Sequence, residues 1–320
     1  MTAAATAIRV EQLTKLYRKE PAVSGLSLEV PMGSVFGLLG ENGAGKTTTI
    51  QLLLGMLKPD GGRVEVLGLD PTRQGREVRR RVGYVPEVPV LYDWMTVSEI
   101  GWFAAGFHPD GYGDTAPFRA RYDRLAEGYG LPTKQKIKAL SKGMKAKVSL
   151  ALAVACDPAL LILDEPTSGL DVLVRREFLE SMVDLAGEGR TVLLSSHQIG
   201  EVERVASHVA LMHKGKLLLA EPLDDLRART FSLSVTFTGR DHPEAPPADL
   251  PLELIDADDA ARQAVWLVHA RDRSACERVR SAAGVDSLRI ETPSLEDIYI
   301  GYMRRRRPAR LDSPAAAFVA

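Results

Sequence analysis

Residues 40–47 form a glycine-rich stretch, Gly-Glu-Asn-Gly-Ala-Gly-Lys-Thr, whose spacing is suited to binding phosphate. In such a loop, successive backbone N–H groups close around phosphate oxygens. The side chain of Lys46 then reaches the terminal phosphates, and the hydroxyl of Thr47 can bind Mg²⁺. The residues expected to contact phosphate are Gly40, Glu41, Asn42, Gly43, Ala44, Gly45, Lys46, Thr47 and Thr48.

A second group of residues that could do chemistry follows an apolar run farther along the chain. Residues 160–163, Leu-Leu-Ile-Leu, have the composition of a buried strand, and the carboxylates of Asp164 and Glu165 come directly after it. Ligands of an open α/β sheet bind just beyond the carboxyl ends of its strands. We therefore expect Asp164 to hold Mg²⁺, directly or through water. Glu165 is expected to activate the attacking water as a general base.

The pattern of apolar residues predicts the elements that position these side chains. Residues 35–39 are typical of a buried strand leading into the phosphate loop, and 48–54 of a helix whose positive N-terminus faces phosphate. Alternating residues at 8–11 and 26–30 predict an antiparallel layer. The short, wholly apolar run at 191–194 resembles 160–163, and both predict central parallel strands covered on two faces.

The composition changes after residue 230. Residues 231–237 alternate as a strand, a proline-rich loop follows, residues 264–269 predict another strand, and 274–283 have helical spacing. This stretch carries no catalytic signal of its own. The predicted organisation is a nucleotide-binding domain at 1–230, a small α+β domain at 231–305 and a disordered tail at 306–320.

Composition limits the classes of protein to which the chain can belong. Its 320 residues are 45% apolar and 26% charged, with a net charge of −1, which is ordinary globular material without a global attraction to nucleic acid. Two cysteines, Cys156 and Cys276, support no disulfide framework and suit a reducing compartment. We find neither a signal peptide nor an apolar run of about 18 residues. The chain is therefore expected not to cross a membrane, and to act on one only through a partner.

Further short motifs surround the two chemical groups in a characteristic order. Residues 140–144, Leu-Ser-Lys-Gly-Met, precede Asp164, and 168–171, Ser-Gly-Leu-Asp, follow it. Residues 83–87, Gly-Tyr-Val-Pro-Glu, lie after the phosphate loop and before these two motifs. With Tyr17 upstream and His197 after the predicted strand at 191–194, the chain resembles the nucleotide-binding subunit of an ATP-binding cassette (ABC) transporter of the export type (ABC-2-like).

This resemblance implies an α/β fold: a phosphate-loop cassette with a mixed sheet, an antiparallel β layer and a helical signature subdomain, plus the small α+β appendage. It implies ATP and Mg²⁺ as cofactors, and two cassettes that pair head to tail around two ATP molecules. Ser141 and Gly143 would then contact the partner's ATP. Ser141 also precedes a helical run, so its hydroxyl and the following N–H groups form an anion site. Asp171 matches the D-loop, a further nucleotide-binding position.

Roles for three other residues follow from the resemblance, each beside a plainer alternative. His197 would contact the γ-phosphate, although a histidine at a strand end is often only a structural hydrogen-bonding group. Tyr17 would stack on adenine, but it could equally be a core residue. Glu87 stands where the family has glutamine; a carboxylate can still bind Mg²⁺ while adding negative charge near the phosphates.

The resemblance also implies a function and partners. We expect an ATPase at the cytoplasmic face of the membrane, driving a separate membrane-spanning permease, with a second cassette subunit as its homodimeric partner and no nucleic acid. The alternatives are a soluble cassette ATPase acting on ribosomes or DNA, and a cassette that binds ATP and signals without turnover. Trp94 is predicted either to anchor the permease or to lie in the core. The arginines at 304–307 are predicted to be a solvated tail or a lipid contact.

Overall fold

The computed structural model describes residues 5–107, 117–239 and 243–305. The chain divides into two compact units, Met1–Glu221 and Pro222–Ala320. The boundary lies ahead of the predicted one at residue 230, because helix α8 (Leu223–Arg229) groups with the second unit. The predicted disordered tail, 306–320, lies outside the described residues.

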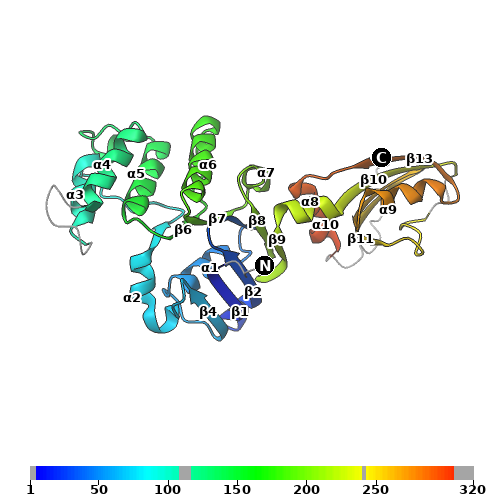
Figure 1. Ribbon diagram of the computed structural model, residues 1–320, viewed down its shortest axis with the longest axis horizontal. Helices are drawn as coiled ribbons and strands as arrows, with labels where there is room; N and C mark the ends of the chain where they lie inside the picture. Colours follow the sequence, from blue (N-terminus) through cyan, green and yellow to red (C-terminus); the bar gives the residue numbers. More distant parts are fainter. Residues whose placement is uncertain (1–4, 108–116, 240–242, 306–320) are drawn as a thin grey trace, which may run out of the picture. The chain divides into compact units, whose positions relative to one another are not determined.

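The first unit contains two sheets (Figure 1). The smaller has the order β2-β1-β4 and is antiparallel, as the alternating residues at 8–11 and 26–30 predict. The larger has the order β5-β6-β7-β3-β8-β9, and its strands from β5 to β8 run parallel. The strands are β1 (Thr6–Tyr17), β2 (Glu20–Pro31), β3 (Val35–Leu39), β4 (Gly61–Val66), β5 (Val82–Val85), β6 (Leu160–Asp164), β7 (Thr191–Ser196), β8 (His208–His213) and β9 (Lys216–Pro222).

The predicted central strands are confirmed, and their burial explains their composition. Every residue of β3, β6 and β7 is buried, so both faces of these strands are covered and no polar alternation is needed. Since parallel strands end at one edge, the residues after β3, β6 and β7 are brought together there. This edge therefore collects the phosphate loop, the pair Asp164-Glu165, and His197.

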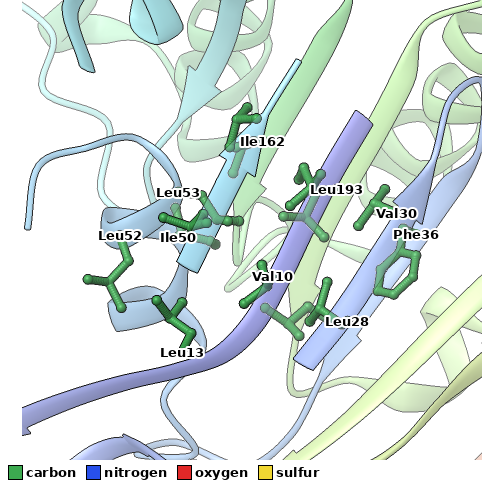
Figure 2. Packing of buried hydrophobic residues seen from close by; sticks show 14 of the residues in the cluster. Val10, Leu13, Leu28, Val30, Phe36, Ile50, Leu52, Leu53, Ile162 and Leu193 are labelled. Atoms are coloured by element: carbon green, nitrogen blue, oxygen red, sulfur yellow. The ribbon is translucent and has the colours of Figure 1, made fainter. Parts of the chain in front are cut away.

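Side chains from both sheets share one core with helix α1 (Lys46–Leu53). Val10 and Leu28 of the antiparallel layer, Ile50 of α1, and Ile162 and Leu193 of the parallel sheet belong to the same buried cluster (Figure 2). Each of the five is no more than 6% exposed. Burying a side chain of this size contributes about 1.5–3 kcal/mol. The core thus holds α1, and the loop before it, against the sheet.

Three helices that lie in the sequence between the phosphate loop and Asp164 form a separate cluster. Its helices are α3 (Val97–Ala105), α4 (Pro117–Gly128) and α5 (Lys142–Ala155), and they have their own buried core. Thr96 and Glu99 form a reciprocal capping box that fixes the start of α3. The Tyr122 hydroxyl donates to the carbonyl of Val97 at 2.7 Å, which ties α4 to α3. The predicted helical subdomain is confirmed.

The described residues of the first unit also form α2 (Pro71–Arg81), α6 (Val172–Gly187) and α7 (Ile199–Val202). Helix α6 follows the segment 168–171, and α7 follows His197. In the described part of the chain, no helix is both long and apolar enough to span a membrane.

The second unit is an antiparallel sheet of order β11-β12-β10-β13 with helices beside it. The strands predicted at 231–237 and 264–269 are present, whereas the helical spacing at 274–283 is split into α9 and a 3₁₀ turn at 278–281. Strand β11 was missed because it is an edge strand rich in acidic residues, without an apolar alternation. The elements are β10 (Thr230–Phe237), β11 (Leu252–Ala260), β12 (Gln263–Ala270), α9 (Arg273–Glu277), β13 (Val285–Glu291) and α10 (Leu295–Arg305).

Candidate functional site

The glycine-rich loop joins β3 to α1 and is held in a conformation that requires glycine. Gly45 is the residue before α1 and has φ +102°, a left-handed conformation that side chains disfavour. A Cβ atom there would collide with the carbonyl oxygen of Ala22. The loop therefore packs tightly on β2, and the first N–H groups of α1, which have no helical partners, are available to bind an anion.

A pocket of about 410 Å³ opens beside this loop. It is lined by the loop and α1 from Asn42 to Thr48, by Ala22, and by three residues from distant parts of the sequence, Tyr17, Glu87 and Glu165. Tyr17 is 46% exposed, so the alternative that it is a core residue is excluded. Gly40 and Glu41 precede the lining residues and contribute through their carbonyl oxygens, described next.

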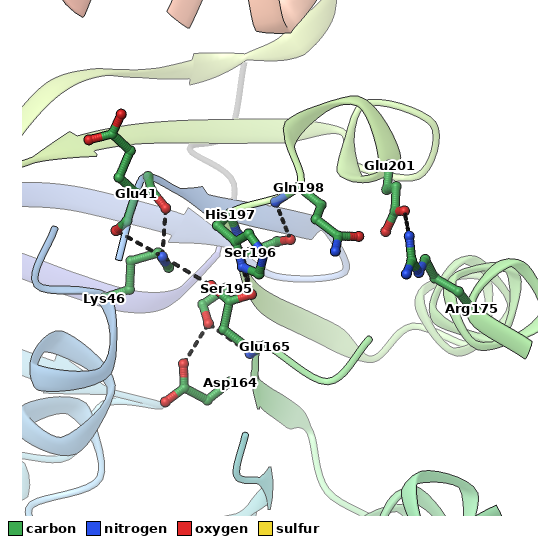
Figure 3. Close-up of polar contacts among 11 residues, drawn as sticks. Glu41, Lys46, Asp164, Glu165, Arg175, Ser195, Ser196, His197, Gln198 and Glu201 are labelled. Carbon is green, nitrogen blue, oxygen red and sulfur yellow. Dashed lines mark hydrogen bonds and ion pairs between the residues drawn. The ribbon is translucent and has the colours of Figure 1, made fainter. Parts of the chain in front are cut away.

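The ammonium of Lys46 is buried, with 6% of its side chain exposed, and has three oxygen neighbours (Figure 3). Its Nζ donates to the carbonyls of Gly40 at 2.6 Å and Glu41 at 3.2 Å. It also lies 3.0 Å from Oε1 of Glu165, an ion pair without hydrogen-bond geometry. Because a buried charge is costly unless it is paired, Glu165 is the counter-ion that stabilises Lys46.

Glu165 itself has an unusual backbone. Its φ is +48°, which is uncommon for a residue with a side chain and costs of order 1–3 kcal/mol. The strain is compensated at its backbone N–H, which donates to the Ser195 hydroxyl at 3.0 Å and to the Ser195 carbonyl at 3.2 Å. These bonds to β7 fix the direction in which the carboxylate leaves β6, toward the pocket.

The imidazole of His197 binds the second oxygen of the same carboxylate. Nδ1 of His197 lies 2.7 Å from Oε2 of Glu165, and the His197 backbone N–H donates to that oxygen at 3.3 Å. A carboxylate only accepts, so Nδ1 carries the proton. In the neutral ring Nε2 is then an acceptor, and it can donate to an anion only when the imidazole is charged. His197 and Glu165 therefore form one hydrogen-bonded unit.

Asp164 lies deeper, beneath this unit. It is 1% exposed, and its Oδ1 accepts a 2.6 Å hydrogen bond from the Ser195 hydroxyl. Burial, with a smaller contribution from the Asp164 charge, raises the pKa of Tyr84 to about 12, so that phenol stays neutral near the site. Ser195 was not among the residues predicted from the sequence. The polar pair Ser195-Ser196 at the end of an otherwise apolar strand could have indicated it.

The residues predicted to hold Mg²⁺ fit that ion in part. Thr47 and Glu87 line the pocket, and Asp164 lies next to the pocket residue Glu165. Within the described ranges, no group of three or more His, Cys, Asp or Glu side chains is arranged to hold a metal. Mg²⁺ commonly uses one or two carboxylates together with substrate phosphates and water. The donor set therefore suits an ion that arrives with a phosphorylated ligand.

Ser141, Gly143 and Asp171 are helix-terminal residues, and none of the three lines the pocket in the described part of the chain. The Ser141 hydroxyl caps α5 by accepting from the Met144 N–H at 3.2 Å. The Asp171 carboxylate caps α6 by accepting from the Val174 N–H at 3.0 Å. Ser141 thus stands at the start of the helix that the sequence predicts, while the pocket around Lys46 is built without these three residues.

An apolar surface follows Glu87. Val88, Val90 and Trp94 are 72%, 88% and 64% exposed, and the Tyr92 ring lies tilted against Trp94 with ring centroids 6.0 Å apart. The alternative that Trp94 is a core residue is therefore wrong. Exposed indole and aliphatic groups in one segment are typical of a protein contact.

Comparison with known proteins agrees with this arrangement. The profile of the family described as ABC transporter matches residues 23–168. The chain is 38% identical over 230 residues to the bacitracin transport ATP-binding protein of Bacillus licheniformis, covering 70% of this chain and 72% of that protein. It is 32% identical over 303 residues to a daunorubicin resistance ATP-binding protein of Streptomyces coeruleorubidus, covering 92% and 95%.

Solved structures show the same fold. The structure of an ATP-binding subunit of an ABC transporter aligns with a TM-score of 0.62 at 32% identity, over 69% of this chain and 92% of that one. The daunorubicin relative extends through both units, whereas this solved cassette covers about the length of the first unit. The chain therefore belongs to the ABC transporter family, as one of its ATP-binding subunits.

Proposed function

We propose that the chain binds ATP with Mg²⁺ in the pocket around Lys46 and hydrolyses it to drive a separate membrane-spanning permease. The observation that carries the proposal is the meeting of an aromatic ring, a phosphate loop and a carboxylate held by His197 around one pocket. Tyr17 would stack on adenine, the loop would hold the phosphates, and Glu165 would face the terminal phosphate.

Hydrolysis follows from the contacts of Glu165. Phosphate oxygens would replace the carboxylate as the partner of Lys46, which leaves Glu165 free to accept a proton from the attacking water. The water oxygen forms a bond to the γ-phosphorus as the bond to the ADP oxygen breaks. When bound, Mg²⁺, held by Thr47, Glu87 and Asp164, neutralises charge on the phosphates. A charged His197 would donate from Nε2 to the γ-phosphate while Nδ1 remains on Glu165.

We further propose that two copies pair around ATP. Ser141, Gly143 and Asp171 lie outside the pocket of their own chain, and exposed apolar residues adjoin them: Val172 is 79% and Leu173 66% exposed. An anion site at the start of α5, next to uncovered apolar side chains, fits a second cassette that brings its own ATP. Pairing on ATP and separation after hydrolysis would cycle the permease.

The proposed direction of transport is based on the names of the relatives. Their names describe transport of bacitracin and resistance to daunorubicin, so we propose an export-type transporter. We propose that the exposed segment from Val88 to Trp94 contacts the permease at the cytoplasmic face of the membrane. Relatives named for transport favour this function over a soluble cassette acting on ribosomes or DNA.

The test is ATP hydrolysis by the purified chain with Mg²⁺, followed as phosphate release. We expect turnover by the wild type and its loss in Glu165→Gln, with ATP binding retained because the phosphate loop is unchanged. Glu180→Gln, an exposed carboxylate of α6, is the matched control and should keep full turnover. Turnover by Glu165→Gln at the wild-type rate would rule out the assigned base.

A further inference from the structure

The first turn of α6 carries an ion pair that joins two functional segments. Nη1 of Arg175 pairs with the carboxylate of Glu201 in α7 (Figure 3). Nη2 of Arg175 donates to the carbonyl of Leu170 at 2.8 Å. Leu170 directly precedes Asp171, and Glu201 lies in the short helix that follows His197. One guanidinium thus connects the segment before α6 to the segment after β7.

The pair is partly buried and incompletely satisfied. The Arg175 and Glu201 side chains are 21% and 26% exposed. Nε of Arg175 and Oε2 of Glu201 are buried without a hydrogen-bond partner among the described residues. Each such group costs stability, so a pair of this kind is a poor stabilising device. Its position between functional segments is the better explanation of its presence.

The same turn contacts the Ser141–Gly143 segment on another side. A Cβ atom at Gly143 would lie 2.8 Å from Cγ1 of Val174, so the start of α5 packs directly on α6. A Cβ atom at Gly169 would meet the end of the flexible Lys142 side chain, so Lys142 lies over the backbone that precedes α6. Consecutive residues of α6, Val174 and Arg175, therefore face the start of α5 and the helix after His197.

We infer that Arg175 is a positioning residue that transmits the placement of the Ser141–Gly143 segment to His197. The inference rests on the proposed function, in which His197 acts on the ATP of its own chain and Ser141 on the ATP of the partner. Movement of α5 against a partner's nucleotide would shift Val174 and, through Arg175 and Glu201, the helix after His197. Through this turn, binding of ATP at one site would change the position of His197 at the other site.

Amide hydrogen exchange on the full chain without nucleotide tests the connection independently of catalysis. Arg175→Gln removes both contacts and should speed exchange about tenfold in the segments 166–171 and 197–203, as expected for loss of charge-assisted hydrogen bonds. Arg176→Gln is the matched control: the neighbouring residue of α6 pairs with Glu180 at the surface and should change neither segment. Unchanged exchange at 197–203 in Arg175→Gln, or an equal effect in the control, would overturn the inference.

Two further variants separate the contacts. Arg175→Gln with Glu201→Gln leaves no unpaired buried charge, so it keeps the test valid if Arg175→Gln alone folds poorly; it should show the same local increase. Arg175→Glu with Glu201→Arg reverses the ion pair but removes the donor to the Leu170 carbonyl. It should restore protection at 197–203 and leave 166–171 fast, and failure to restore 197–203 would contradict a role for the pair.

Kinetics distinguish positioning from binding. In Arg175→Gln, kcat should fall about tenfold or more while the ATP dissociation constant changes less than about twofold, since small misplacements of catalytic groups cost rate. A loss that appears only in ATP affinity would overturn the positioning role. If the wild type does not hydrolyse ATP, the proposed function fails, and the exchange experiment still decides whether Arg175 connects the two segments.

Discussion

Glu165 is assigned two roles, and the first can be tested without catalysis. It is the counter-ion of Lys46, at 3.0 Å, with 7% and 6% of the two side chains exposed. Glu165→Gln keeps the size and shape of the side chain but removes its charge. The buried ammonium of Lys46 is then left with two neutral carbonyl acceptors.

The expected cost follows from the burial of the pair. Breaking a buried ion pair by neutralising one partner costs about 3–5 kcal/mol, because the other charge stays buried. The substituted side chain remains polar and keeps an oxygen near Nζ of Lys46, so we expect the lower end, about 3 kcal/mol. For a unit of about 150–250 residues, each kcal/mol shifts the melting temperature by about 2–4 °C. The first unit of Glu165→Gln should therefore melt about 6–12 °C lower than that of the wild type.

Calorimetry without and with ATP is the assay. Without nucleotide the variant should show the full decrease, and saturating ATP should remove most of it, because phosphate oxygens then neutralise Lys46. Glu180→Gln, which breaks an exposed pair on α6, should melt with the wild type in both conditions. Equal melting of Glu165→Gln and wild type without ATP would refute the counter-ion role.

Three other substitutions probe the margins of the pocket and the exposed surface. Tyr17→Ala should weaken ATP binding about tenfold by loss of stacking, measured by fluorescence titration, whereas Tyr92→Ala, equally exposed outside the pocket, should not. Glu87→Gln should retain ATPase activity, because an amide oxygen also binds Mg²⁺; complete loss would show that the assigned role is wrong. Trp94→Ala should weaken recruitment to permease-containing membranes about tenfold or more, with ATP binding unchanged; unchanged recruitment would remove Trp94 from the contact.

Much of the site could be predicted because its chemistry is local in sequence. The phosphate loop, with its glycines and Lys46, is one continuous stretch, and Asp164 and Glu165 directly follow an apolar strand. Parallel strands end at one edge of a sheet, so buried runs in the sequence suffice to predict that these groups meet. The central strands and the antiparallel layer were predicted by the same apolar patterns.

The remaining features depend on pairs of residues far apart in the chain. The bond from Ser195 to Asp164 and the pair of Arg175 with Glu201 join residues on different elements, and no periodicity specifies such partners. The positive φ of Glu165 is accompanied by a hydrogen bond from its N–H to Ser195 of β7, a partner that the local sequence does not identify. Edge strand β11 was missed because acidic residues occupy positions that an apolar alternation would need.

If two copies of this chain close around ATP, as proposed, an ATP-dependent dimer should be detectable in solution. Glu165→Gln and wild type would be compared by size-exclusion chromatography with light scattering, with ATP in the presence and absence of Mg²⁺. Removing the base while sparing the phosphate loop should trap an ATP-dependent dimer of the variant, whereas the wild type with Mg²⁺ hydrolyses ATP and returns to monomer. A variant that binds ATP yet stays monomeric at every ATP concentration would contradict the account.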